Sequence, residues 1–279
     1  MKLFNIQYPY NQARIIALGI GLDKTTSFKK GTSKGPESIR KASTSLEAFD
    51  YLTDTEVLEK NPVHDSGNLN AKKSFNRVLK EIEEKITGIN KHAKVPLLLG
   101  GEHSISIPAV KALKKEKPLV IVFDAHADLR EEFEGKRICH ATCSRRILDF
   151  IPKKDLIVLG VRSLSRQELE FIKKNKLKVF FIEEIKKESG KIIKLIERES
   201  KNRKIYLSID IDAFDPSIAP GTGTPEHNGL AYSEFKELIK AIKGKIIGLD
   251  LVEVLPDKEM ITPLLAGKII IDLLALKEF

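Results

Sequence analysis

The sequence predicts an α/β protein of three layers, α/β/α, in which a central and mainly parallel sheet lies between helices. Short runs of Val, Ile and Leu without strict alternation recur along the 279 residues, and such runs are typical of strands covered on both faces. Longer amphipathic stretches separate them, and this alternation favours parallel strands joined by helices. No Ser/Gly/Pro-rich linker interrupts the pattern, so we expect a single domain over residues 1–279.

Seven apolar runs are predicted as strands, namely Arg14–Leu18, Val95–Leu99, Leu119–Phe123, Leu156–Leu159, Lys178–Phe181, Ile205–Ile209 and Ile246–Leu249. Apolar residues at spacings of three and four predict helices at Ala71–Ile89, Glu183–Ser200, Ser233–Ile242 and Ile261–Leu276. A further helix is expected to begin near Ile105 or Pro108, with Ser104 as its cap. In such sheets ligands bind at the carboxyl ends of the strands, so functional residues should follow these runs.

The distribution of charge limits the kind of partner. The net charge is +9, but lysines are mixed with glutamates, as in Lys80–Lys85, which indicates solvated helix faces rather than a nucleic-acid surface. No apolar run approaches the roughly 20 residues of a membrane-spanning helix. The segment Met1–Tyr10 lacks the apolar region of a secretory signal. The two cysteines, Cys139 and Cys143, are too few for a disulfide framework, so we expect a cytoplasmic protein.

Three potential metal ligands directly follow the run Leu119–Phe123. Asp124, His126 and Asp128 occupy alternate positions, so an extended chain would direct their side chains to one side. The two intervening alanines would lie on the other side, where small residues leave room for close packing. The end of this strand therefore predicts a cluster of ligands.

Two further strand ends carry residues of the same kind. Asp210 and Asp212 follow the run Ile205–Ile209, and two carboxylates in such a place are costly to bury unless a cation neutralises them. His103 follows a Gly-Gly turn after the run Val95–Leu99. Both positions extend the predicted cluster.

Together these positions make six candidate ligands: His103, Asp124, His126, Asp128, Asp210 and Asp212. Any one of them alone would more often cap a helix or form a turn, but three strand ends that all carry ligand types predict a metal site. Oxygen and imidazole donors without thiolate favour Mn²⁺ or Mg²⁺ over structural Zn²⁺. Four carboxylates exceed what one ion needs, so two ions about 3.5–4 Å apart fit better.

With these motifs the sequence resembles the ureohydrolase family, which includes arginase and agmatinase. The matching strings are Gly100–Ser104, Asp124–Asp128, Ser208–Pro216, Pro220–Pro225, Gly31–Arg40 and Asp250–Val254. The match runs from near residue 14 to the end of the chain. The resemblance implies the arginase/deacetylase-like fold, with a mainly parallel central sheet, and hydrolysis of a guanidino group to urea and an amine.

The resemblance also implies two Mn²⁺ ions per subunit and a homotrimer or homohexamer. By position, one ion would be held by His103, Asp124, Asp128 and Asp210. The other would be held by Asp124, His126, Asp210 and Asp212.

Three residues are expected to act on the substrate. Asp128 would orient the hydroxide that attacks the guanidinium carbon. Glu253 matches the family residue that binds the guanidinium, and a carboxylate there complements a cation. His140 matches the family's proton-shuttling histidine and would supply the proton that the leaving amine needs, although alone it would be interpreted as a surface histidine.

The residues expected around the rest of the substrate favour agmatine. Arginases carry an Asn where this chain has Arg130, and Pro220–Glu226 looks more like agmatinase. The ammonium group of agmatine would pair with Glu131, Glu132 or Glu134, although a solvated acidic loop is the simpler interpretation of each. Arg130 would instead hold a carboxylate, which leaves arginine and guanidinobutyrate as alternatives.

Two functions of other classes are also considered. A regulatory protein on a retired hydrolase fold would have lost ligands, yet all six positions are filled. A deacetylase-like amide hydrolase would use one Zn²⁺ and a Tyr, and would not need the second Asp-x-Asp pair. The number of metal ions per chain separates these possibilities. His227, which departs from the family loop, is expected at the surface.

Overall fold

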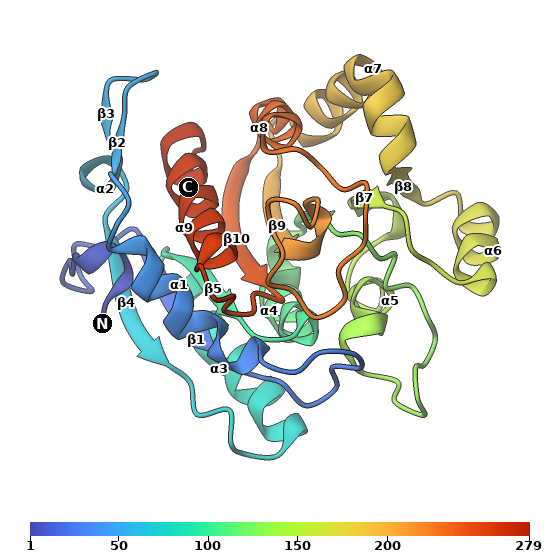
Figure 1. Ribbon diagram of the computed structural model, residues 1–279, viewed down its shortest axis with the longest axis horizontal. Helices are drawn as coiled ribbons and strands as arrows, with labels where there is room; N and C mark the ends of the chain where they lie inside the picture. The colour runs from blue at the N-terminus through green and yellow to red at the C-terminus, as the bar shows by residue number, and fades with distance from the viewer.

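The computed structural model describes residues 1–279 and confirms the α/β fold class, with a central eight-stranded sheet (Figure 1). Every pairing between neighbouring strands is parallel. In spatial order the strands are β4 (Val63–Asn68), β1 (Ile15–Ile20), β5 (Val95–Gly100), β10 (Lys245–Val252), β9 (Lys204–Asp210), β6 (Leu119–Phe123), β7 (Leu156–Val161) and β8 (Lys178–Phe181). A small antiparallel hairpin of β2 (Phe49–Asp50) and β3 (Thr55–Glu56) lies outside this sheet.

Helices cover both faces of the sheet, because successive strand residues point to opposite sides. In β6, Ile121 and Phe123 belong to one hydrophobic cluster, and Val120 and Val122 belong to another. The first cluster is completed by α1 (Gly35–Ser43), α2 (Val57–Lys60), α7 (Ile182–Ser200), α8 (Tyr232–Ala241) and α9 (Ile261–Leu276). The second is completed by α3 (Phe75–Lys91), α4 (Ser106–Leu113), α5 (Cys143–Ile147) and α6 (Arg166–Asn175). None of these helices is both long and apolar enough to cross a bilayer.

The predicted strands and helices are all present, with changes at their ends and additions between them. Helix α3 begins at Phe75 rather than at Ala71. Strand β4 was not predicted, because its sequence Val63-His-Asp-Ser-Gly-Asn68 is mostly polar, as an edge strand allows. The expectation that Ser104 caps the next helix is wrong, since its hydroxyl donates to Glu102 Oε1 at 2.6 Å and α4 begins two residues later.

A buried ion pair joins α1 to the edge of the sheet. Arg40 and Asp65 are each only 1% exposed, and the guanidinium donates to both carboxylate oxygens, at 2.7 and 2.9 Å. Burial alone would raise the pKa of Asp65, but hydrogen bonds from Arg40 and from the backbone of Gly67 and Leu3 outweigh it and lower that pKa. Helix α1 follows the loop at Leu22–Gly31, so this pair also anchors a segment near the pocket described below.

We predict that Arg40→Met lowers the free energy of unfolding by about 3–5 kcal/mol, because it leaves a buried carboxylate without its partner. The loss should be full above about pH 4, the usual pKa of an aspartate, and should shrink as the pH falls, since Asp65 is then neutralised. Denaturant unfolding at several pH values measures both effects.

Arg166 is the matched control, because its pair with Glu170 is exposed, with Arg166 92% accessible. The Arg166→Met variant should change stability by less than about 1 kcal/mol at every pH. Equal losses in the two variants would contradict the assignment of the buried pair.

Candidate metal centre and active site

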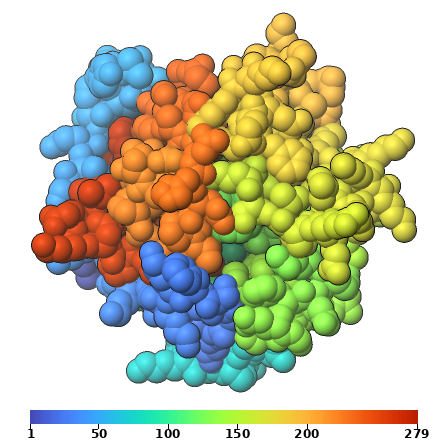
Figure 2. Space-filling model, turned by 45° about the vertical axis from the view of Figure 1, so that its right-hand side comes forward, coloured from blue at the N-terminus to red at the C-terminus, as the bar shows by residue number.

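A pocket of about 220 Å³ opens at the carboxyl edge of the sheet, where β5, β6, β9 and β10 end. Figure 2 shows a recess here, where blue, light-green and orange segments of the chain meet. Seven of the eight residues predicted as metal ligands or catalytic groups line it: His103, His126, Asp128, His140, Asp210, Asp212 and Glu253. The residues that follow these apolar runs therefore meet at one pocket.

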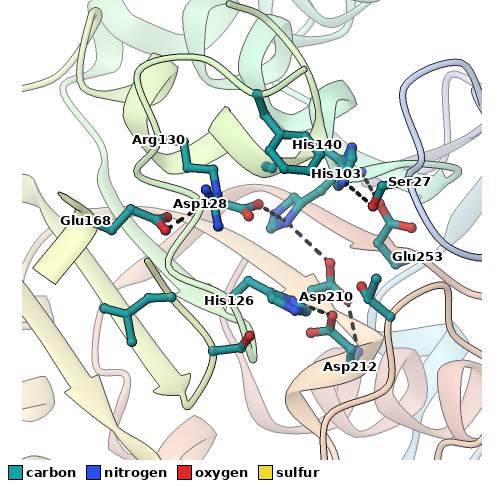
Figure 3. Close-up of a pocket in the computed structure, with 15 residues that line it drawn as sticks. Ser27, His103, His126, Asp128, Arg130, His140, Glu168, Asp210, Asp212 and Glu253 are labelled. Carbon is teal, nitrogen blue, oxygen red and sulfur yellow. Dashed lines mark hydrogen bonds and ion pairs between the residues drawn. The ribbon is translucent and has the colours of Figure 1, made fainter. Parts of the chain in front are cut away.

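One group of ligand atoms surrounds His103. Its Nδ1 atom lies 3.0 Å from Asp124 Oδ2, 3.3 Å from Asp128 Oδ2 and 3.3 Å from Asp210 Oδ2. All four side chains are buried, and they come from the ends of three different strands. Figure 3 shows Asp128 and Asp210 turned toward His103. His103, Asp124 and Asp210 are close enough together to hold a single metal ion.

A second group shares Asp124 with the first. His126 Nδ1 lies 2.9 Å from Asp212 Oδ2 and 3.6 Å from Asp124 Oδ1. Asp124, His126 and Asp212 are likewise close enough to hold an ion. Because Asp124 turns one oxygen to each group, the two groups lie side by side at the bottom of the pocket.

These groups fit divalent cations. His103 Nδ1 and Asp124 Oδ2 are buried without a hydrogen-bond partner, although they face each other. Burial, with the charges of Asp212 and Asp124, raises the pKa of Asp210 well above its usual value. Burial and Asp124 together raise the pKa of Asp128 to about 7. Cations among these oxygens would occupy the unpaired atoms and favour the ionised carboxylates, so the donors present suit metal binding.

A hydrogen-bonded chain below the pocket sets the orientation of His103. Ser208 Oγ donates to Asp250 Oδ1 at 2.6 Å, and Tyr206 donates to the other oxygen of Asp250. With its proton used there, Ser208 Oγ accepts from His103 Nε2, 3.0 Å away. The Nδ1 lone pair of His103 is then directed toward the carboxylates, as a metal ligand requires.

Arg162, which follows β7, holds the loops around Asp212. Its guanidinium donates to the backbone oxygens of Asp212 at 2.6 Å and of Glu226 at 2.9 Å. Further bonds reach the backbone oxygens of His227 and Gly160, at 2.9 and 3.0 Å. One side chain thus ties the turn at Ile211–Ala213 to the loop that closes the pocket on that side.

Two of the predicted catalytic residues have left-handed backbone conformations. Asp128 has a φ of 52° and Glu253 a φ of 59°, and each costs about 1–3 kcal/mol in a residue other than glycine. Glu253 is held by its Oε1 atom, which accepts the backbone N–H of His103 at 2.8 Å. Burial raises the pKa of Glu253 well above its usual value, and a cation bound beside it would favour its ionised form.

His140 and Arg130 line the pocket above these residues. His140 belongs to the turn His140–Thr142, and burial lowers the pKa of its imidazole. Arg130 is 37% exposed, and its Nε atom lies 3.6 Å from Glu168 Oε2. Both residues therefore contact the space that a substrate would fill.

Other residues named from the sequence lie outside the pocket. Glu131 pairs with Arg145 and Arg146, and neither Glu132 nor Glu134 lines the cavity. This agrees with the simpler interpretation of an exposed acidic loop. His227 is exposed, as expected.

Several residues that shape the pocket were not identified from the sequence. Glu168 is buried and lines the cavity, and its position three residues after Ser165 is the local signature of a helix N-terminus. Glu102 and Thr25 contact each other beside His140, although 77 residues separate them in the chain. No local pattern indicates Thr25 or Arg162, because their partners are brought together only by the fold.

We predict that Mn²⁺ or Mg²⁺ raises the melting temperature of metal-free protein, because the ion binds the folded state alone. At 100 times the dissociation constant the gain is about 2.7 kcal/mol. Differential scanning calorimetry and elemental analysis measure the gain and the number of ions per chain. In the variant Asp124→Asn the gain should vanish, since both groups share this residue.

The exposed Asp149 supplies the matched control. The variant Asp149→Asn should respond to the metal as the unmodified chain does. If neither Mn²⁺ nor Mg²⁺ changed the melting temperature of the unmodified chain, the two groups would bind neither ion.

The sequence matches the arginase family over residues 13–275. It is 35% identical to an agmatinase of Bacillus anthracis, over 98% of this chain and 95% of that one. It is 37% identical to an N(1)-aminopropylagmatine ureohydrolase of Thermococcus kodakarensis, over 88% of this chain and 84% of that one.

A solved structure gives the same result for the fold. The agmatine ureohydrolase of Thermoplasma volcanium superposes with a TM-score of 0.92 at 33% identity, covering 99% of this chain and 94% of that one. Sequence and fold therefore point to one family over nearly the whole length.

Proposed function

The chain belongs to the arginase family and is a ureohydrolase, and we propose that it cleaves agmatine to putrescine and urea with two Mn²⁺ ions per subunit. The observation that carries the proposal is the pair of ligand groups that share Asp124 at the bottom of a pocket. The proposed ligands are the six residues His103, Asp124, His126, Asp128, Asp210 and Asp212.

When bound, such ions supply Lewis acidity that makes water a nucleophile near neutral pH. The chain provides the remaining parts. Glu253 lies in the pocket as a buried carboxylate, so it would bind the planar guanidinium through charge-assisted hydrogen bonds. Asp128, 3.3 Å from His103 Nδ1, would orient the attacking water and take part in moving its protons.

The proton balance explains why a histidine is needed at the pocket wall. Water adds its oxygen to the guanidinium carbon, the bond from that carbon to the substituted nitrogen breaks, and the products are urea and an alkylammonium ion. Both protons of the water therefore end on the leaving nitrogen. His140 lines the pocket and is the imidazole proposed to carry a proton to that nitrogen.

The net charge of the pocket wall is compatible with a cationic substrate tail. Arg130 lies 3.6 Å from Glu168, and its guanidinium lies over the Phe133 ring at 5.2 Å. Because Glu168 neutralises Arg130, the pair adds no net positive charge to the pocket. A carboxylate tail, as in arginine or guanidinobutyrate, would have to compete with Glu168 for the arginine.

N¹-aminopropylagmatine is a second candidate substrate. The relative from Thermococcus kodakarensis that is named for this compound is 37% identical to this chain. N¹-aminopropylagmatine has the same guanidino group as agmatine, and its longer polyamine tail carries further positive charge. Both compounds suit the same proposed chemistry, so they have to be compared directly.

Urea release from a panel of guanidino compounds tests the substrate. For Mn²⁺-loaded protein we expect kcat/KM to be highest with agmatine, and at least about tenfold lower with arginine, guanidinobutyrate and guanidine. The first two carry a carboxylate in the tail, and guanidine has no tail. N¹-aminopropylagmatine as the best substrate would select the second candidate. A preference for guanidinobutyrate that is lost in Arg130→Gln would overturn the proposal of a cationic tail.

The variant His126→Ala tests the second ligand group. We expect one bound ion in place of two and a loss of turnover of at least about 100-fold, because the chemistry uses both ions. Elemental analysis and urea release measure the two effects. The exposed His227 provides the control, and His227→Ala should keep two ions and full turnover. Unchanged turnover in His126→Ala would refute the ligand assignment.

A further inference from the structure

A buried hydroxyl group connects Glu102 to the imidazole of His140. Thr25 Oγ1 lies 2.6 Å from Glu102 Oε1 and 3.3 Å from His140 Nδ1. The same oxygen accepts the backbone N–H of His140 at 3.1 Å. Thr25 is 5% exposed and Glu102 is fully buried, so water does not compete for these contacts.

Glu102 is surrounded by hydrogen-bond donors. Its Oε2 atom accepts the backbone N–H groups of Thr25, at 2.7 Å, and of Lys24. Its Oε1 atom accepts the hydroxyls of Thr25 and Ser104, both at 2.6 Å. Four donors fill the acceptor sites of this carboxyl group, and the one proton of the Thr25 hydroxyl is committed to it.

The direction of these hydrogen bonds determines which ring nitrogen of His140 carries the hydrogen. Because the Thr25 hydroxyl donates to Glu102, its oxygen can only accept from the imidazole, so Nδ1 carries the hydrogen and Nε2 has the lone pair. Nε2 lies 3.4 Å from Ser27 Oγ, a residue that lines the pocket. The ring edge of His140 also meets Phe133, with centroids 5.8 Å apart and planes at 84°, which restricts its rotation.

We propose that Thr25, held by Glu102, is a positioning residue that keeps His140 in the Nδ1–H tautomer with Nε2 free to exchange protons in the pocket. This inference rests on the proposed function, in which His140 carries a proton to the leaving nitrogen. In that step Nε2 accepts a proton that originates from water and releases it to the amine. The Nδ1–H bond to Thr25 is kept throughout, so the ring need not turn.

Nitrogen NMR of the histidine rings tests the tautomer without any turnover. Protein with ¹⁵N-labelled histidine and Mg²⁺, which is diamagnetic, should show His140 as the Nδ1–H form, assigned by the missing signal in His140→Gln. In Thr25→Val, which removes the hydroxyl, the Nε2–H form should become populated. An Nε2–H ring in the unmodified chain would overturn the proposal.

Kinetics of paired variants test the consequence for catalysis. Thr25→Val should lower kcat about 10- to 100-fold, within the range that acid–base catalysis contributes, and should change KM by less than about threefold. Thr25→Ser restores the hydroxyl and should recover most of kcat. Equal kcat in Thr25→Val and Thr25→Ser would overturn the role of the hydroxyl.

The neighbouring Thr26 gives the matched control for loosening of the loop. Its hydroxyl donates to Asp23 at 2.6 Å and does not contact His140, so Thr26→Val should change kcat by less than about threefold. A fall in Thr26→Val equal to that in Thr25→Val would assign the effect to the loop and overturn the proposal.

His140→Gln separates this inference from the proposed function. Full turnover in His140→Gln would show that His140 carries no proton, which is a failure of the proposed function. A severe loss in His140→Gln with normal kcat in Thr25→Val would leave the proton carrier in place and reject the positioning role alone.

Discussion

The concentration of negative charge at one edge of a parallel sheet is the constraint on which the rest of the structure depends. Asp124, Asp128, Asp210 and Asp212 are all at most 7% exposed. Buried carboxylates this close to one another cannot all remain ionised without cations. Burial and mutual repulsion accordingly raise the pKa values of Asp128 and Asp210. The parallel sheet brings them together because its strands end at the same edge, and cations bound among them would balance their charge.

The ligands are oriented by a second set of buried polar contacts. His103 is held by the Ser208–Asp250 chain, and the turn that carries Asp212 is held by Arg162. His140 is placed in the same way, by a hydroxyl whose proton is committed to a carboxylate. For both histidines a buried carboxylate fixes the direction of a hydrogen bond, which fixes the ring nitrogen presented to the pocket. The site is therefore rigid at its base, which suits chemistry that needs close positioning of water and substrate.

The fold could be predicted from the sequence because its signals are local. Apolar runs such as Leu119–Phe123 and Ile205–Ile209 indicate buried strands on their own, whereas polar β4 does not. The six proposed ligands were found for a related reason, since each follows a strand end within a short motif. Thr25, Arg162 and Glu102 were not, because their roles depend on contacts across long separations in the chain, such as the 77 residues between Thr25 and Glu102. Sequence patterns thus identify residues placed by one element, and they miss residues defined by the meeting of several.

The base and the wall of the pocket differ in burial, and this difference separates the residues for the reaction from those for the choice of substrate. The base of the pocket is buried, and its side chains are fixed by reciprocal contacts. The wall that would meet the substrate tail includes Arg130 and lies beside Glu226, whose side chains are 37% and 38% exposed. Exposed charges interact weakly with each other and can change partners at small cost. Discrimination among agmatine, its aminopropyl derivative and guanidino acids therefore depends on whether Glu168 keeps Arg130 neutralised when a substrate enters, because only a free Arg130 would favour an anionic tail.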